Sequence, residues 1–241
     1  MTEALRQKAE KIFAREPVWH MDMSESLKRQ QGQVLYAEGS TVLMRESFMP
    51  NFYRLTTDSA EAGLKAFAHQ PAPFLAVLRG EGVEEIAQKL GLHLGTPCCQ
   101  GAYTGTEPLN WSLEGLEIGL MTQEELPLAV EIYEGKDYVQ GLFEHKQMFS
   151  ARLHGEFAGF IGFHGDGSTG LLEVLPDFRR RGIGQCLEKY MVNLCLERGW
   201  TNYGHIYIDN APSFALQESL GLTVDKKHLL YWAGRGAPEA Q

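Results

Sequence analysis

The stretch from Leu172 to Gly184, LEVLPDFRRRGIG, most constrains what this chain can fold into. Its apolar beginning predicts a strand, which Pro176 ends because proline has no backbone N–H to donate to a sheet. Three consecutive arginines and two closely spaced glycines follow, and residues 185–191 then have helical spacing. The sequence therefore predicts a strand, a basic turn and the start of a helix.

This basic turn is a candidate anion site. Backbone N–H groups in the first turn of a helix have no partner within the helix, and the helix macrodipole adds roughly half a positive charge there. Gly182 and Gly184 carry no side chain, so a phosphate can approach the backbone closely. We therefore expect a phosphorylated ligand at this turn. The alternative is a solvated basic turn in front of an ordinary helix.

Two common nucleotide-binding motifs do not fit the turn. A mononucleotide P-loop requires GxxxxGK[ST], and neither Lys-Ser nor Lys-Thr follows Gly184. The dinucleotide motif GxGxxG also fails, because Leu187 stands where its third glycine belongs. The pattern that is present is Arg-x-x-Gly-x-Gly over residues 179–184.

That pattern resembles the acetyl-CoA pyrophosphate loop of the GNAT superfamily of N-acetyltransferases. A second segment, His205 to Leu222 (HIYIDNAPSFALQESLGL), resembles the superfamily's other signature: a strand, an asparagine, then a helix ending in Leu-Gly-apolar. This segment is also similar to the glycine N-acyltransferase-like branch. The two motifs stand in the expected order, and the resemblance covers about residues 116–232. It implies a GNAT fold in the C-terminal half, an α/β arrangement with a mixed sheet, and acetyl-CoA as the cosubstrate.

The resemblance also assigns cofactor contacts. In the superfamily the strand before the loop pairs through its backbone with the pantetheine arm, and the loop holds the pyrophosphate. The residues with an expected cofactor contact are Leu172, Val174, Arg179, Arg180, Arg181, Gly182, Ile183, Gly184, Gln185, Asn210 and Ser213. Asn210 is also expected to cap the helix that follows it, and a role as cap alone is the alternative.

Acetylation of an amine needs a neutral amine, stabilisation of an oxyanion and protonation of a thiolate. Some GNAT enzymes carry a catalytic Glu at the start of the fifth strand, where this chain has His205. An imidazole suits deprotonation of an ammonium group at neutral pH, although a purely structural histidine is an equal alternative. Glu173 is the rival base, because a lone carboxylate between apolar strand residues is costly unless it is solvated or paired.

The general acid is a departure from the family pattern. Many members place a tyrosine on the helix after the asparagine, and here that position is Gln217, which cannot usefully donate a proton. Tyr207 could replace it, or the thiolate could leave without a proton. The resemblance therefore leaves the general acid open.

The domain organisation follows from the alternation of elements. We expect an N-terminal α/β domain over residues 1–105, a linker over 106–115, a GNAT domain over 116–233 and a loose tail over 234–241. The N-terminal half is interpreted as a smaller, degenerate GNAT-like repeat in which TDSA (57–60) replaces the basic loop. An unrelated α+β domain is the alternative, and in either case this half is expected to lack a phosphate site.

Two local signals set expected boundaries in the C-terminal half. Thr122 and Glu125 form a capping box that predicts a helix from Thr122 through Tyr133. His228 to Trp232 is predicted as the last strand.

Composition limits the partners. The net charge of −9 argues against nucleic acid and anionic membrane, and it favours a small-molecule amine as the acceptor. The four cysteines have no metal-binding spacing, no apolar run approaches eighteen residues, and the first residues lack the apolar core of a signal peptide. We therefore expect a cytoplasmic, metal-free N-acetyltransferase. The alternative is an inactive acyl-CoA-binding sensor or interaction module whose N-terminal half mediates homodimerisation.

Overall fold

The computed structural model describes residues 3–133 and 136–236, which form two compact units. Unit 1 comprises residues 3–102, 205–217 and 223–236, and unit 2 comprises the described residues of 103–204 together with 218–222. Two C-terminal segments therefore pack with the N-terminal half of the chain.

Unit 1 is built on an eight-stranded mixed sheet with the order β1-β2-β3-β4-β12-β6-β11, in which β5 also pairs with β12. Its strands are β1 (Gly32–Glu38), β2 (Thr41–Glu46), β3 (Phe52–Thr57), β4 (Leu75–Gly80), β5 (His93–Leu94), β6 (Cys98–Ala102), β11 (Tyr203–Tyr207) and β12 (Thr223–Gly234). Its helices are α1 (Glu3–Phe13), α2 (Met21–Lys28), α3 (Ala60–Phe67), α4 (Val83–Leu90) and most of α8 (Ala211–Ser219).

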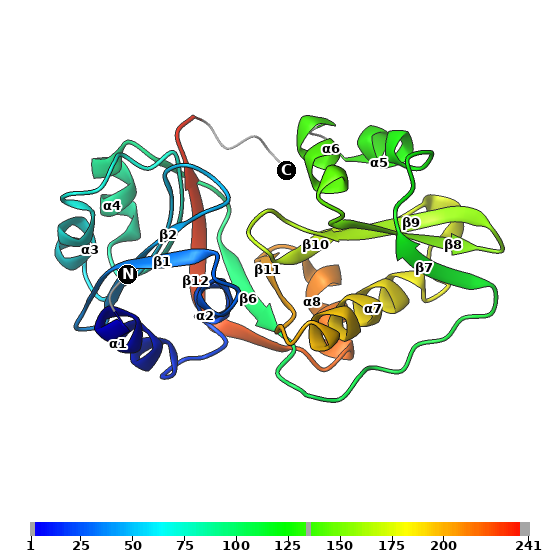
Figure 1. The fold of residues 1–241 in the computed structure, drawn as a ribbon, viewed down its shortest axis with the longest axis horizontal. Coiled ribbons are helices and arrows are strands. Elements are labelled where there is room, and N and C mark those ends of the chain that lie inside the picture. Colours follow the sequence, from blue (N-terminus) through cyan, green and yellow to red (C-terminus); the bar gives the residue numbers. More distant parts are fainter. Residues whose placement is uncertain (1–2, 134–135, 237–241) are drawn as a thin grey trace. The chain divides into compact units, whose positions relative to one another are not determined.

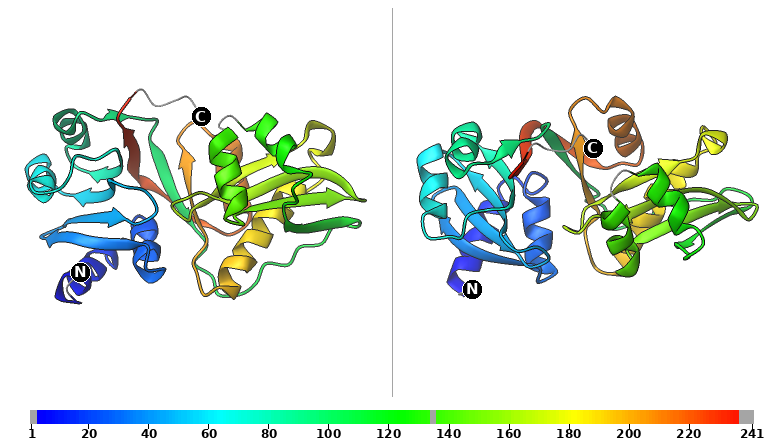
Figure 2. Two further views of the ribbon diagram at one scale, coloured as in Figure 1. Left: turned by 45° about the horizontal axis from the view of Figure 1, so that its top comes forward. Right: turned by 90° about the horizontal axis from the view of Figure 1, so that it is seen from above.

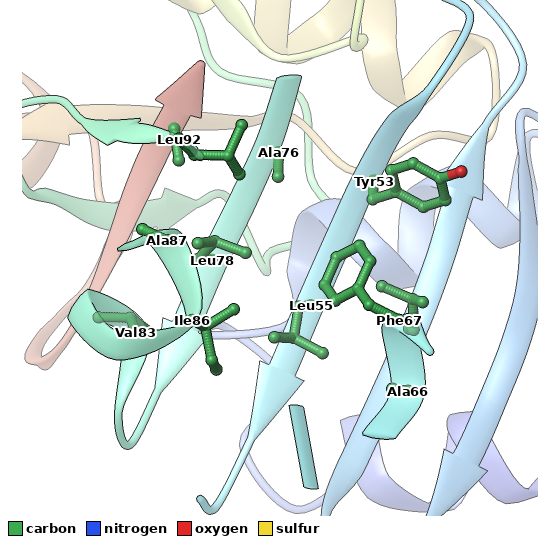
Figure 3. Packing of buried hydrophobic residues seen from close by; sticks show 12 residues of the cluster. Tyr53, Leu55, Ala66, Phe67, Ala76, Leu78, Val83, Ile86, Ala87 and Leu92 are labelled. Atoms are coloured by element: carbon green, nitrogen blue, oxygen red, sulfur yellow. The ribbon is translucent and has the colours of Figure 1, made fainter. Parts of the chain in front are cut away.

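Apolar side chains fill both faces of the first strands of this sheet. Figure 3 shows the cluster between the sheet and the helices α3 and α4, in which Leu55 and Leu78 of neighbouring strands contact Ile86 of α4. Tyr53 and Phe67 meet edge to face with their ring centroids 5.4 Å apart. A second cluster joins α1 and α2 to β1 and β2. The sheet is therefore covered by two separate helix pairs.

Unit 2 contains a four-stranded antiparallel sheet with the order β10-β9-β8-β7. Its strands are β7 (Leu116–Leu120), β8 (Met148–Leu153), β9 (Glu156–Phe163) and β10 (Thr169–Val174). Its helices are α5 (Leu126–Ile132), α6 (Lys136–Glu144) and α7 (Ile183–Glu197). In Figures 1 and 2, α7 lies on one face of this sheet and α5 and α6 lie on the other, and each face has its own apolar cluster.

The structure corrects two predicted boundaries. The last strand is twelve residues long rather than five, because β12 pairs with β4 over Leu230–Gly234 and with β6 over Thr223–Asp225. The ladders at its two ends, with β6 and with β4, extend the strand across a polar stretch that has little strand propensity of its own. Gly234, predicted to begin a loose tail, ends this strand, and residues 237–241 of that tail lie outside the described residues.

The helix expected from Thr122 begins at Leu126 instead. One arm of the capping box forms, because the Thr122 backbone N–H donates to the Glu125 carboxylate over 2.8 Å. Ser150 and Arg152 also donate to that carboxylate, over 2.9 and 2.7 Å, and draw Glu125 toward the sheet. Residues 123–125 therefore form a turn in front of the helix. None of the described helices is both long enough and apolar enough to cross a membrane.

A buried ionic cluster joins α2 to the sheet of unit 1. The Asp22 carboxylate accepts hydrogen bonds from Arg54 and Arg79, and all three side chains are fully buried. Arg54 Nε also donates to Glu46 over 2.8 Å. Burial alone would raise the pKa of Asp22, but the guanidinium groups of Arg79 and Arg54 outweigh it and hold that pKa well below its ordinary value.

We expect Asp22→Asn to lower the free energy of unfolding by about 3–5 kcal/mol, because it removes the carboxylate that pairs with buried Arg79 and leaves buried Arg54 with Glu46 alone. Urea unfolding followed by circular dichroism measures the loss. The control is Glu10→Gln, which breaks the exposed Arg6–Glu10 pair and should cost below about 1 kcal/mol. Equal urea midpoints for the two variants would contradict the stabilising role of the cluster.

Candidate functional site

The basic loop of unit 2 has an unusual backbone. After β10, Pro176–Phe178 form a single 3-10 turn, and Arg180 and Gly182 then adopt left-handed conformations with φ of +60° and +83°. Helix α7 begins at Ile183, directly after Gly182. Left-handed residues close to a helix start turn successive N–H groups toward one concave side. The predicted strand, basic turn and helix start are thus confirmed.

A cavity of about 520 Å³ lies beside this loop. One wall is the first two turns of α7 and the loop itself, with Arg181, Gly182, Gln185 and Lys189, and the other wall is the segment 110–113, with Trp111. This volume suits a ligand of nucleotide size. The guanidinium of Arg181 and the ammonium of Lys189 give the cavity a positive charge.

The wall at 110–113 is fastened to α7. The Leu109 backbone N–H donates to Asn193 Oδ1 over 2.7 Å, and Asn193 Nδ2 donates back to the Leu109 carbonyl over 3.0 Å. Lys189 Nζ donates to the Asn110 carbonyl over 3.1 Å. Sequence analysis assigned this segment to a linker and missed Trp111 and Lys189. A large aromatic residue within a stretch of linker composition is the signal that could have singled out Trp111.

The three arginines of the loop have different environments. Arg179 turns back onto β10, where its Nε donates to the Val174 carbonyl and its Nη2 to the Glu173 carboxylate, both over 2.8 Å. Arg180 is exposed. Arg181 stands over the Phe178 ring at 5.6 Å and lines the cavity. Of the predicted arginine contacts, Arg181 is therefore the best placed for an anion, and the predicted base Glu173 is engaged in an ion pair.

Strand β10 is an edge strand of its sheet. One of its edges pairs with β9, and the other pairs with no strand of that sheet. Its register shifts between Gly170 and Glu173, and Leu171 in this bulge has φ of +57°. Leu171 packs with the cluster of α5 and α6, whereas Leu172 and Val174 pack with the cluster of α7. The bulge therefore re-aims the main-chain groups of the strand just before Leu172.

The remaining predicted site residues belong to unit 1. The His205 side chain is 7% exposed, with its Nε2 3.9 Å from the Asp22 carboxylate and its ring edge-on to Trp232. Tyr207 packs against an apolar cluster that contains Phe52 and Trp232. Asn210 Oδ1 accepts from the Ser213 backbone N–H over 3.1 Å, which confirms the predicted helix cap.

The equivalent turn in the N-terminal half is closed. Helix α3 has a side-chain cap: Ser59 Oγ accepts a hydrogen bond from the Ala62 backbone N–H over 3.2 Å. The strands β3 and β4 pair at six successive positions, and a Cβ added to Gly80 would lie 1.8 Å from the Thr57 carbonyl oxygen. This turn offers neither a basic side chain nor space for an anion.

Comparisons with known proteins agree with this architecture. Residues 148–232 match the family model for FR47-like proteins. A search of curated protein sequences found no significant match. Among solved structures, a Drosophila protein aligns with 98% of this chain and 98% of its own length, at 16% identity and a TM-score of 0.69.

Two further structures carry the fold name. A GNAT-family protein from Novosphingobium aromaticivorans is 18% identical over 92% of this chain and 97% of its own, with a TM-score of 0.55. A GCN5-related N-acetyltransferase from Kribbella flavida is 14% identical over 91% of this chain and 96% of its own, also with a TM-score of 0.55. The chain therefore has the GNAT fold, and its N-terminal half is GNAT-like as well. The predicted fold class is confirmed.

We expect Gly182→Asp to weaken acetyl-CoA binding at least about tenfold, because it puts a carboxylate where the anion approaches. A Cβ at Gly182 meets no atom within 4 Å, so the substitution does not clash with the protein itself. Calorimetric titration measures the dissociation constant.

The matched control is Gly199→Asp, just past the other end of α7. Gly199 has φ of +67° and equally open surroundings, so it carries the same backbone strain away from the cavity. Its dissociation constant should stay at the wild-type value. Equal affinities for the two variants would place the cofactor away from this loop.

Proposed function

We propose that the chain is an acyl-CoA-dependent N-acyltransferase that transfers an acetyl group to the amine of a small molecule or amino acid. The observation that carries the proposal is the combination, within unit 2, of a bulged edge strand, a left-handed basic loop and a helix start beside a positively charged cavity. The GNAT fold of the chain adds a precedent for this use of the three elements.

The residues of unit 2 fit acetyl-CoA as a cosubstrate. The N–H groups at the start of α7 and the Arg181 guanidinium would hold its pyrophosphate, since Gly182 leaves the approach open. The edge of β10 that does not pair with β9 would pair with the pantetheine arm at Leu172 and Val174, where Arg179 Nε now donates to the Val174 carbonyl. When bound, the cosubstrate supplies an acetyl group activated as a thioester. The proposal includes no metal, and among the described residues no cluster of three or more His, Cys, Asp or Glu could hold one.

The bulge in β10 supports a role for its main chain in catalysis. A backbone N–H that is aimed at a developing oxyanion stabilises it without reorganisation, and the Leu172 N–H follows directly on the left-handed Leu171. We propose this group as the oxyanion donor.

For the proton of the incoming ammonium we retain His205 as the proposed base, with Glu173 as the rival. The contact between Glu173 and Arg179 favours His205, since one Glu173 carboxylate oxygen already accepts a hydrogen bond from Arg179 Nη2 over 2.8 Å. Tyr207 stays the proposed general acid, because the position at which many GNAT members have a tyrosine is Gln217 in this chain. The acceptor is a cationic or amine-bearing molecule, which suits the net charge of −9.

The test of the activity is CoA-thiol release from acetyl-CoA in the presence of a panel of amines and amino acids. We expect release that depends on one class of amine and that disappears in Gly182→Asp. Tight acetyl-CoA binding without release for any amine would favour the sensor or interaction module instead.

Two variants, His205→Gln and Glu173→Gln, test which residue is the base. His205→Gln is expected to lower kcat by about 10²–10⁴ with an unchanged dissociation constant for acetyl-CoA, and the acidic limb of the pH–rate profile should disappear. Glu173→Gln should be mild. A near-normal His205→Gln enzyme beside an inactive Glu173→Gln enzyme would assign the base to the carboxylate.

A further inference from the structure

Tyr138 of α6 and His164, the residue directly after β9, form a side-chain pair within unit 2. The Tyr138 hydroxyl and His164 Nδ1 are 2.8 Å apart. Their rings are nearly parallel, with an interplanar angle of 24° and centroids 6.1 Å apart. The sequence analysis assigns neither residue a role.

The pair lies at the beginning of β10, at the opposite end of the strand from the anion loop. A Cβ added to Gly170 would be 2.3 Å from His164 Nε2, so the imidazole occupies the space that a side chain at position 170 would take. The His164 backbone N–H donates to the Ser168 carbonyl over 2.8 Å, which closes the hairpin and holds the ring beside β10. Gly170 directly precedes the bulge residue Leu171.

The inference rests on the proposed function, in which the position of the pair determines what it can contact. An arm that is anchored at residues 179–184 and paired with Val174 and Leu172 runs toward Gly170. Val174 and Gly170 are about 13 Å apart along a strand, at roughly 3.3 Å per residue. The reactive end of such an arm therefore comes to the part of β10 that carries His164 and Tyr138.

We propose that Tyr138 and His164 relay the proton that the acceptor nitrogen loses on forming its bond to the acyl carbon, and return it to the departing sulfur. The Tyr138 oxygen takes the proton from nitrogen as its own proton passes to His164 Nδ1. As the C–S bond breaks, its electron pair stays on sulfur, and the proton travels back through Tyr138 to that sulfur. The pair ends in its starting state, and in this inference it takes the place of Tyr207 as the acid that Gln217 cannot supply.

The environment of the pair suits a relay between neutral groups. Burial lowers the pKa of His164, and the nearby Asp166 carboxylate only partly opposes this. Desolvation, then the charge of Asp166, raises the pKa of Tyr138, and the Gly165 backbone only partly opposes this. A neutral imidazole can accept a proton and a neutral phenol can donate one. The Tyr138 side chain is 42% exposed, which leaves it accessible to a small amine.

The pair has a second candidate role, which is only to fasten α6 to the β9–β10 hairpin. The two roles predict different behaviour for Tyr138→Phe, which removes one oxygen and keeps the ring. A relay loses kcat at an unchanged KM for acetyl-CoA, whereas a fastener changes stability and both constants together.

The experiment compares Tyr138→Phe and His164→Gln with the wild type in amine-dependent CoA release and in nitrogen NMR of the free protein. We expect Tyr138→Phe to lower kcat by about 10²-fold or more with the KM for acetyl-CoA unchanged. In the free protein the Nδ1 resonance of His164 should shift in Tyr138→Phe while its Nε2 resonance moves little. Matched controls are Tyr133→Phe and His145→Gln, which should keep kcat within about twofold.

The outcomes separate this inference from the proposed function. A wild-type enzyme that releases no CoA with any amine contradicts the proposed function, and the NMR shift still tests the contact within the pair. An active wild type beside Tyr138→Phe and His164→Gln enzymes of near-normal kcat overturns the relay alone. A loss in Tyr207→Phe with none in Tyr138→Phe would also overturn it. If His164→Gln does not fold, Tyr138→Phe decides the question by itself.

Discussion

The rest of the structure depends on the two ladders of backbone hydrogen bonds that the last strand, β12, forms with its neighbours. β12 pairs with β4 on one side and with β6 on the other, so the C-terminal end of the chain completes the sheet of the N-terminal half. With β11 and β12 in that sheet, the remaining sheet ends at β10. The edge of β10 that does not pair with β9, which we propose as the cofactor platform, thus results from the pairing of β11 and β12 in the other sheet.

Features set by neighbouring residues were predictable, and features set by distant partners were not. The loop at 179–184 and the Asn210 cap each depend on a few successive residues, and both have the predicted form. Helix α2 was not predicted, because the apolar face of MDMSESLK consists of little more than Met23 and Leu27. Asp22 becomes acceptable in the interior only beside Arg54 and Arg79 of two distant strands. The contact of Arg179 with Glu173 was missed because a sequence does not show that a loop turns back on its strand.

The two halves show how few residues decide whether a helix start binds an anion. In the N-terminal half Ser59 caps α3 with its own hydroxyl, so the first N–H groups of that helix are already partly satisfied. In the C-terminal half the residue at the same place is Gly182, which has no side chain to cap α7 and leaves the N–H groups of its first turn to an external acceptor. One topology therefore carries a capped, structural helix start in unit 1 and, in unit 2, an uncapped one that we propose as an anion site.

Two glycines, Gly170 at the start of β10 and Gly182 in the loop after it, lack a side chain for opposite reasons. At Gly182 a Cβ would meet no protein atom, so the missing side chain leaves room for a ligand. At Gly170 a Cβ would collide with His164, so the missing side chain leaves room for a protein group. Between them the left-handed Leu171 directs the main chain toward Leu172. In the proposed mechanism, anion binding, oxyanion stabilisation and proton transfer then follow one another from the loop after β10 to the start of that strand. On this proposal the absence of a tyrosine at Gln217 does not leave the reaction without an acid, because the Tyr138 phenol of α6, paired with His164, lies beside the start of β10.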